Sequence, residues 1–183
     1  MRADPPSLEH LPSRDAEGRW LAVVEATQGS RHKFKYEAPW RAFVLKGVLP
    51  LGLSFPYDFG FVPSTLGDDG DPLDVLVLAD EALPPGAVVP CRVVGIIEAE
   101  QQDRGEAAER NDRLIAVADA SHRYANCHDL DDVAGNVLDE VERFFVHFNV
   151  QKGGAFRPLG RRVAAEAVAV LEAGAKRFSA GAA

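Results

Sequence analysis

Three aspartates within six residues of one another are the strongest chemical feature of this chain. They are Asp69, Asp71 and Asp74, and an apolar run follows them directly. Gly70 and Pro72 disfavour a regular strand or helix here, so a turn can bring the three carboxylates together. Like charges this close repel one another, and a folded chain tolerates them best around a cation or in solvent. The segment therefore predicts a site for a divalent metal ion.

Such a site would suit the hydrolysis of a phosphorus compound. Mg²⁺ prefers oxygen ligands in octahedral geometry and usually keeps several waters. Two metal ions about 3.5–4 Å apart can generate hydroxide from water and hold the leaving oxygen, and a further carboxylate can accept a proton. The alternative interpretation is a surface turn in which Asp69-Gly70 is an ordinary Asp-Gly pair with solvated neighbours. The segment alone leaves both interpretations open.

Cationic residues that could hold an anionic substrate occur on three predicted strands. Lys33, Lys35 and Glu37 alternate and therefore share one strand face. A lysine and a glutamate side by side could hold a phosphate oxygen and a metal-bound water, although a solvated strand face explains the same pattern. Lys46 is equally ambiguous, and Arg113 opens another apolar strand.

The elements that must position these residues are short strands followed by helices. Alternation and apolar runs predict strands over 20–25, 33–37, 41–46, 75–78, 88–97 and 114–118. Gly95 is the predicted position of a bulge or close approach, and the polar residues 98–112 predict a loop. Apolar residues at three- and four-residue intervals predict a helix over 133–148, and an alanine-rich stretch predicts another over 164–178. This order favours an α+β fold with a closed or nearly closed barrel.

Composition restricts the class of protein. The chain has 183 residues and a net charge of −8, which fits one globular core and argues against a nucleic-acid binder. No apolar run approaches the roughly 18 residues of a membrane span, and the N-terminus lacks the apolar core of a secretion signal. We therefore expect a cytoplasmic protein. Its predicted organisation is a polar arm over 1–19, a single domain over 20–178 and a flexible tail over 179–183.

Taken together, these motifs resemble the family I soluble inorganic pyrophosphatases over most of residues 20–178. The segment from Asp69 to Val75 carries the resemblance, and Lys35-Tyr36-Glu37 and the run 113–117 support it. The resemblance implies an OB-like five-stranded closed β-barrel with flanking C-terminal helices. It further implies a Mg²⁺ requirement, hydrolysis of diphosphate to two phosphates, and a homo-oligomer with a hexamer favoured.

The resemblance also implies roles for the acidic residues. Asp69, Asp71 and Asp74 correspond to the metal-binding and water-activating aspartates, with Asp71 as the general base. A fourth metal ligand is expected within 98–109, where Glu100, Asp103 and Glu106 are candidates and Asp103 is preferred.

The remaining implied site residues come from four other strands. Glu25 and Glu37 match acids that act on metal-bound water and count here as catalytic candidates. Lys35 matches the substrate-binding lysine. Lys46 falls near a phosphate-binding arginine of the family, and Arg113 matches a lysine that contacts phosphate.

Several positions depart from the family pattern. Phe55, Phe59 and Phe148 stand where the family usually has tyrosine, and a phenyl ring offers no hydroxyl to a phosphate oxygen. Asn149 replaces a lysine, and Asn111 replaces an aspartate. The metal-binding half of the pattern is therefore nearly complete, while the phosphate-binding half is altered.

These departures motivate one structural hypothesis and two alternative functions. The hypothesis is that Arg157, Arg161 or Arg162, which follow Asn149 closely, approaches the site and replaces the lost donors. One alternative function is hydrolysis of another small diphosphate or phosphoester on the same scaffold. The other is a catalytically weak homologue with a binding or regulatory role.

Overall fold

The computed structural model describes residues 7–181, so residues 1–6 of the predicted arm and 182–183 of the predicted tail lie outside it. The strands in chain order are β1 (Trp20–Ala26), β2 (His32–Glu37), β3 (Ala42–Val48), β4 (Asp58–Phe61), β5 (Asp74–Leu78), β6 (Val88–Gln102), β7 (Glu109–Arg110), β8 (Arg113–Ala118) and β9 (Ala155–Val163). The helices are η1 (Leu8–His10), η2 (Leu130–Asp132), α1 (Gly135–Gln151) and α2 (Ala164–Gly181).

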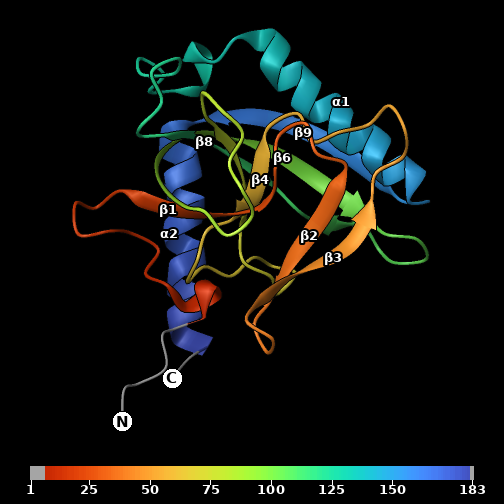
Figure 1. The fold of residues 1–183 in the computed structure, drawn as a ribbon, viewed down its shortest axis with the longest axis horizontal. Coiled ribbons are helices and arrows are strands. Elements are labelled where there is room, and N and C mark those ends of the chain that lie inside the picture. The colour runs from red at the N-terminus through yellow and green to blue at the C-terminus, as the bar shows by residue number, and fades with distance from the viewer. Residues whose placement is uncertain (1–6, 182–183) are drawn as a thin grey trace.

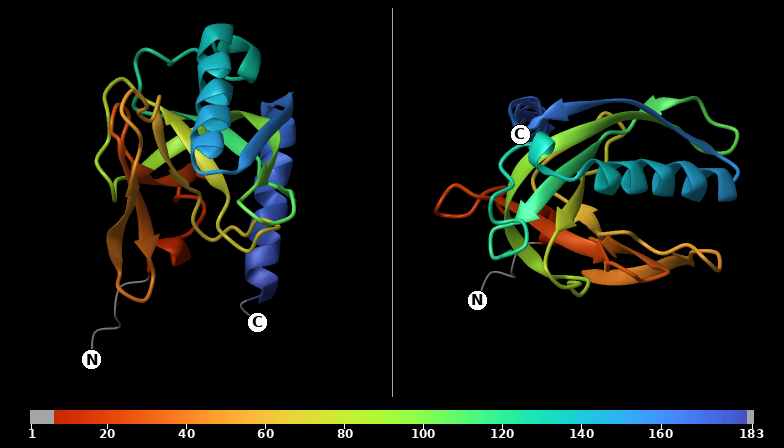
Figure 2. Two further views of the ribbon diagram at one scale, coloured as in Figure 1. Left: turned by 90° about the vertical axis from the view of Figure 1, so that its right-hand side faces the viewer. Right: turned by 90° about the horizontal axis from the view of Figure 1, so that it is seen from above.

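The main sheet closes on itself. Antiparallel pairs join β1 to β4, β4 to β5 and β8 to β6, a parallel pair joins β5 to β8, and β6 pairs back with β1. The ring β1-β4-β5-β8-β6 confirms the predicted closed barrel, and α1 and α2 confirm the predicted C-terminal helices (Figures 1 and 2). The fold is therefore α+β with an OB-like barrel.

The two faces of the barrel strands pack against different helices. Along β5, Leu76 and Leu78 belong to the apolar cluster that contains the phenylalanines of α1. Their neighbours Val75 and Val77 point the other way, into the cluster that contains Leu171 of α2. Alternate strand residues point to opposite faces, so both faces of this short apolar run are buried.

Some strands of the structure were not predicted from the sequence. No strand was predicted over the residues of β4, but β4 pairs with β1 on one side and β5 on the other. The predicted loop over 98–112 is wrong in part, because β6 continues to Gln102 and β7 pairs with its end. The segment between the predicted helices is β9, which runs along β6. The end of β6, β7 and β9 are largely polar and partly exposed, and such strands lack the apolar alternation that predicts a strand.

Gly95 lies where the backbone of β6 approaches its neighbours most closely. A Cβ atom there would stand 2.6 Å from Leu130 Cδ1 and 2.8 Å from the carbonyl oxygen of Arg162. The register of β6 against β8 also shifts between Val93 and Gly95. The prediction of a bulge or close approach at Gly95 is therefore confirmed.

The β2–β3 hairpin and the described part of the N-terminal arm pack together beside the barrel. Ser7 Oγ donates a hydrogen bond of 3.2 Å to the Tyr36 hydroxyl on β2. The backbone of Arg14 forms an isolated antiparallel β-bridge with Trp20 of β1. At the other end, α2 continues to Gly181, so it includes residues 179–181 of the predicted tail. No helix within residues 7–181 is both long and apolar enough to cross a membrane.

Candidate active site

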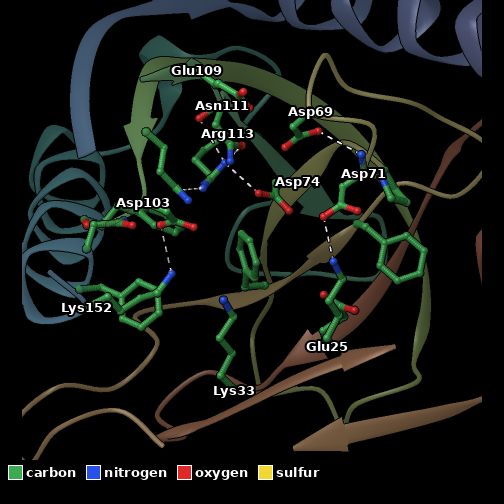
Figure 3. Close-up of a pocket in the computed structure, with 18 of the residues that line it drawn as sticks. Glu25, Lys33, Asp69, Asp71, Asp74, Asp103, Glu109, Asn111, Arg113 and Lys152 are labelled. Atoms are coloured by element: carbon green, nitrogen blue, oxygen red, sulfur yellow. Dashed lines mark hydrogen bonds and ion pairs between the residues drawn. The ribbon is translucent and has the colours of Figure 1, made fainter. Parts of the chain in front are cut away.

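One cavity of about 330 Å³ collects most of the residues with predicted roles. Its walls come from β2, the loop before β5, the region from β6 to β8, and the C-terminal part of α1 (Figure 3). The residues with predicted catalytic, substrate-binding or metal-binding roles that line it are Glu25, Lys35, Asp69, Asp71, Asp74, Asp103 and Arg113, together with Glu106, the alternative candidate for the fourth metal ligand. These residues are therefore brought together by the fold from distant parts of the sequence.

The loop that carries the aspartates is a compact turn. Its ends are held by the Gly67 amide, which donates to the Asp71 carbonyl oxygen at 2.7 Å, and Gly70 has a φ of 84° that favours glycine. The Asp71 amide donates to Asp69 Oδ1 at 3.1 Å. This geometry turns both carboxylates toward the cavity, while Asp74 follows as the first residue of β5. The prediction of an irregular turn here is confirmed.

Two of the aspartates bind cationic side chains. Lys35 Nζ lies 2.8 Å from Asp71 Oδ2, and Arg113 Nη1 lies 2.8 Å from Asp74 Oδ2. The first pair is exposed, with 62% of the Asp71 side chain accessible to solvent, whereas the Arg113 side chain is only 4% accessible. Burial raises the pKa of Asp74, and the nearby Arg113 charge opposes that rise. Asp71 is thus accessible to a water molecule, while Asp74 and Arg113 form the floor of the cavity.

Glu25 is a buried carboxylate that titrates near neutrality. The Tyr36 amide of β2 donates to Glu25 Oε1 at 2.6 Å, which fixes the side chain between the barrel and the hairpin. Burial raises the pKa of Glu25 to about 7, although the Tyr36 hydrogen bond and the nearby Lys35 charge oppose that rise. A carboxyl group with this pKa can hold or release a proton at physiological pH.

Two residues with predicted roles lie outside the cavity lining. Lys46 of β3 and Glu37 of β2 form an ion pair with each other across the hairpin. Neither is among the residues that line the cavity. Their predicted contacts with substrate or metal-bound water would therefore require a movement of these side chains.

The hypothesis that an arginine after Asn149 replaces the lost donors is wrong. Arg157 pairs with Glu100, Arg162 pairs with Glu98, and Arg161 pairs with two acids of α1. These arginines belong to β9, where they bind neighbouring acids and do not line the cavity. Closeness to Asn149 in the sequence therefore did not predict where these arginines lie, because the pairing of β9 with β6 directs their side chains to other acids.

Other polar residues also line the cavity. Lys33 shares a face with Lys35, and this alternation marked it in the sequence as a cation that could hold an anionic substrate, although the family resemblance assigned it no role. Lys152 caps the C-terminus of α1, and its Nζ lies 3.4 Å from Asp103 Oδ1. Gln101 accepts a hydrogen bond of 2.9 Å from Arg113 Nη2. Nothing local to Lys152 or Gln101 predicts their place, because it depends on how α1 and β6 pack.

The phenylalanines that replace tyrosines form one aromatic wall. Phe148 stacks on Phe144 with ring centroids 5.8 Å apart, and Phe55 stacks on Phe59 at 6.1 Å. Phe55, Phe59 and Phe148 all line the cavity, as does Asn149. The Asn149 amide donates to the Phe145 carbonyl oxygen within α1. This wall therefore presents apolar surface where the family pattern has hydroxyl and ammonium groups.

The donor atoms of the cavity fit a hard divalent cation. The aspartate side chains supply carboxylate oxygens, which are the ligands that Mg²⁺ prefers. As they stand, no three acidic, histidine or cysteine side chains within residues 7–181 are grouped closely enough to hold a metal ion. Asp71 and Asp74 are instead paired with Lys35 and Arg113. A bound cation would have to replace part of this pairing, and it would relieve the repulsion among the carboxylates.

Comparisons with known proteins agree with this geometry. The model of a family described as inorganic pyrophosphatase matches residues 22–179. A protein named inorganic pyrophosphatase from a Nostoc species is 38% identical over 146 residues, which cover 79% of this chain and 83% of that protein. One of the same name from Thermus thermophilus is 39% identical over 140 residues, covering 76% of this chain and 77% of the relative.

The crystal structure of inorganic pyrophosphatase from Thermus thermophilus superposes on this chain with a TM-score of 0.86. The superposition covers 95% of this chain and 99% of that chain, at 33% sequence identity. The similarity therefore extends beyond the aspartate loop to the barrel, the hairpin and both helices.

Proposed function

Because the chain belongs to the inorganic pyrophosphatase family, it is a hydrolase of inorganic diphosphate, and we propose that the cavity described above is its active site. The observation that carries this proposal is that acidic and basic side chains line the same cavity. Asp69, Asp71 and Asp74 face it from one loop, while Lys35 and Arg113 supply cations from two different strands. A substrate that carries both metal ions and phosphate oxygens needs both kinds of group.

The family requires a divalent metal cofactor, and we propose that it is Mg²⁺ in this protein. Asp69, Asp71 and Asp74 would hold it, and Asp103 would contribute from the far side of the cavity. When bound, Mg²⁺ would polarise phosphoryl oxygens and lower the pKa of water.

The side chains themselves have separable tasks in this proposal. Asp71, which is more exposed than Asp74, accepts a proton from the attacking water. Its partner Lys35 exchanges Asp71 for a phosphate oxygen when substrate binds, which frees the carboxylate to act as a base. Arg113, held by Asp74 and Gln101, keeps a fixed positive charge against the departing phosphate. Glu25 holds a proton near neutral pH beside Lys35.

The proposal is tested by measuring phosphate released from diphosphate with Mg²⁺. Wild-type protein should release phosphate well above the rate of an Asp71→Asn variant, which keeps the shape of the side chain but cannot accept the proton. Equal rates for the two proteins, across a range of pH and of divalent metals, would contradict it.

The aromatic wall favours one alternative substrate class. Phe55, Phe59 and Phe148 could contact the organic part of another small diphosphate or phosphoester. Phosphate release from such compounds, with none from diphosphate, would support this alternative. Binding of phosphate compounds without any release would instead indicate a regulatory homologue.

We further propose that the protein acts in the cytoplasm as a homo-oligomer, with a hexamer favoured. Large apolar side chains on and near the β2–β3 hairpin are exposed, including Trp40 at 72% and Leu51 at 86%. Contact between copies would remove such surface from water. Light scattering on the purified protein gives the mass directly, and a monomer at micromolar concentration would contradict the oligomer.

A further inference from the structure

Lys33 differs from the other cationic groups of the cavity in having no acidic partner. Lys35, Lys152 and Arg113 each form an ion pair with an aspartate of the cavity. Within residues 7–181, the Lys33 side chain has no hydrogen bond or ion pair, and its Nζ lies 5.4 Å from the centre of the Phe148 ring (Figure 3). A partly buried cation with no counter-ion is costly, so its position calls for an explanation.

The surroundings of Lys33 strengthen this point. Lys152 Nζ also lies 5.4 Å from the centre of the Phe148 ring, so both lysines approach the same aromatic side chain. Burial lowers the pKa of Lys33, and the nearby charges of Lys152 and Arg113 lower it further, against the opposing effects of Asp74 and Glu25. Two ammonium groups lie beside one ring, and Lys152 is paired with Asp103 whereas Lys33 has no carboxylate partner. An anion is the ligand that would supply the missing counter-charge.

The same end of the cavity lacks other donors for a phosphate. Phe148 has no hydroxyl group, and the Asn149 side-chain amide is already bound to the Phe145 carbonyl oxygen. Lys46 is paired with Glu37 and does not line the cavity. Lys33 and Lys152 are therefore the side chains that can offer N–H groups on the Phe148 side of the cavity.

We propose that Lys33 binds a phosphoryl group of diphosphate on the Phe148 side of the cavity, with Lys152 as its neighbour. This inference rests on the proposed function and assigns to Lys33 the donor role that Phe148 and Asn149 cannot fill. The ammonium group contacts substrate in the ground state as well as during the reaction. Its loss should therefore weaken binding more than it slows the chemical step.

The kinetic test compares Lys33→Gln with Lys33→Arg at saturating Mg²⁺. Because a hydrogen bond from a charged group is worth about 1.5–3 kcal/mol, Lys33→Gln should raise KM about ten- to a hundredfold and change kcat less than about threefold. Lys33→Arg should restore most of the lost affinity, since it returns the charge. Lys176→Gln, at an exposed position of α2, is the matched control and should leave both constants unchanged. An unaltered KM in Lys33→Gln would overturn the proposal.

A binding measurement separates this proposal from the proposed function. Calorimetry with Mg²⁺ and imidodiphosphate, a diphosphate analogue with a P–N–P bridge, reports affinity without turnover. The Lys33→Gln variant should bind it about ten- to a hundredfold more weakly than wild type and Lys176→Gln, with an unchanged Tm. Equal affinities would overturn the role of Lys33 even if the enzyme hydrolyses diphosphate. Failure of wild type to hydrolyse diphosphate would instead contradict the function, and the affinities would still decide the role of Lys33.

Discussion

The two sides of the cavity are built in different ways. On the acidic side, a turn of six residues supplies three carboxylates, and two of them already have cationic partners. On the opposite side, Lys33 and Lys152 come from separate elements and meet only at the Phe148 ring. The acidic side is thus specified by local sequence, while the cationic side is specified by how β2 and α1 pack.

This difference separates the chemistry from the recognition of substrate. The acidic side holds the groups that would bind metal and accept a proton, so changes there should affect kcat. The cationic side holds groups that would bind phosphate oxygens, so changes there should affect KM. A departure from the family pattern at Phe148 or Asn149 can therefore be compensated by a lysine from another strand without altering the aspartate loop.

Removal of the divalent metal should produce the largest effect. Without a cation, the carboxylates of the acidic side cannot polarise substrate, so a chelator should lower phosphate release by about a thousandfold or more. Restoring Mg²⁺ should recover the rate. Phosphate release that continues in excess chelator would show that the acidic side does not work through a metal ion.

Next in size is a pH effect on the metal-free protein. Glu25 has a pKa of about 7 in the folded state, against an ordinary value of 4.5. Between pH 4.5 and 7, the folded state therefore keeps a proton on Glu25 that the unfolded state has released. The stability that this protonation contributes is present in full below about pH 4.5 and is lost as pH rises through 7. It amounts to about 3 kcal/mol.

Denaturant unfolding at a series of pH values measures this contribution. The Glu25→Gln variant keeps an oxygen for the Tyr36 amide but cannot titrate, so its free energy of unfolding should fall less between pH 4.5 and 7. Parallel curves for Glu25→Gln and wild type would show that Glu25 does not hold this proton.

A smaller effect is expected when a hydroxyl is returned to the cationic side. Phe148→Tyr adds a donor next to Lys33, and one neutral hydrogen bond is worth about 0.5–1.5 kcal/mol. The variant should lower KM for diphosphate about two- to tenfold and leave kcat nearly unchanged. A large fall in kcat would mean that the aromatic wall contributes to the chemical step and not only to binding.

The smallest effect should come from replacing Arg161. Only its position after Asn149 in the sequence made it a candidate for binding substrate. Its guanidinium group binds Asp139 and Glu142 of α1. Arg161→Gln should leave both kinetic constants unchanged and lower the free energy of unfolding by about 1 kcal/mol or less. A raised KM would return this arginine to the substrate-binding groups.

The sequence predicted the closed barrel, the helices and the acidic side because each has a local pattern. Apolar periodicity identified α1, and a continuous apolar run identified β5. The sequence did not predict β4 or β9, because Gly60 and the arginines of β9 obscure strands that pairing stabilises. Lys152 was missed for a different reason, because its place in the cavity depends on the direction of a whole helix.

The most direct test of this division is a single set of initial-rate measurements against diphosphate concentration at saturating Mg²⁺. Wild type, Asp71→Asn and Lys33→Gln are compared in parallel. Asp71→Asn should lower kcat about a hundredfold or more with KM within a few-fold of wild type, whereas Lys33→Gln should raise KM and nearly preserve kcat. An Asp71→Asn variant with wild-type kcat, or two variants that alter the same constant equally, would contradict the account.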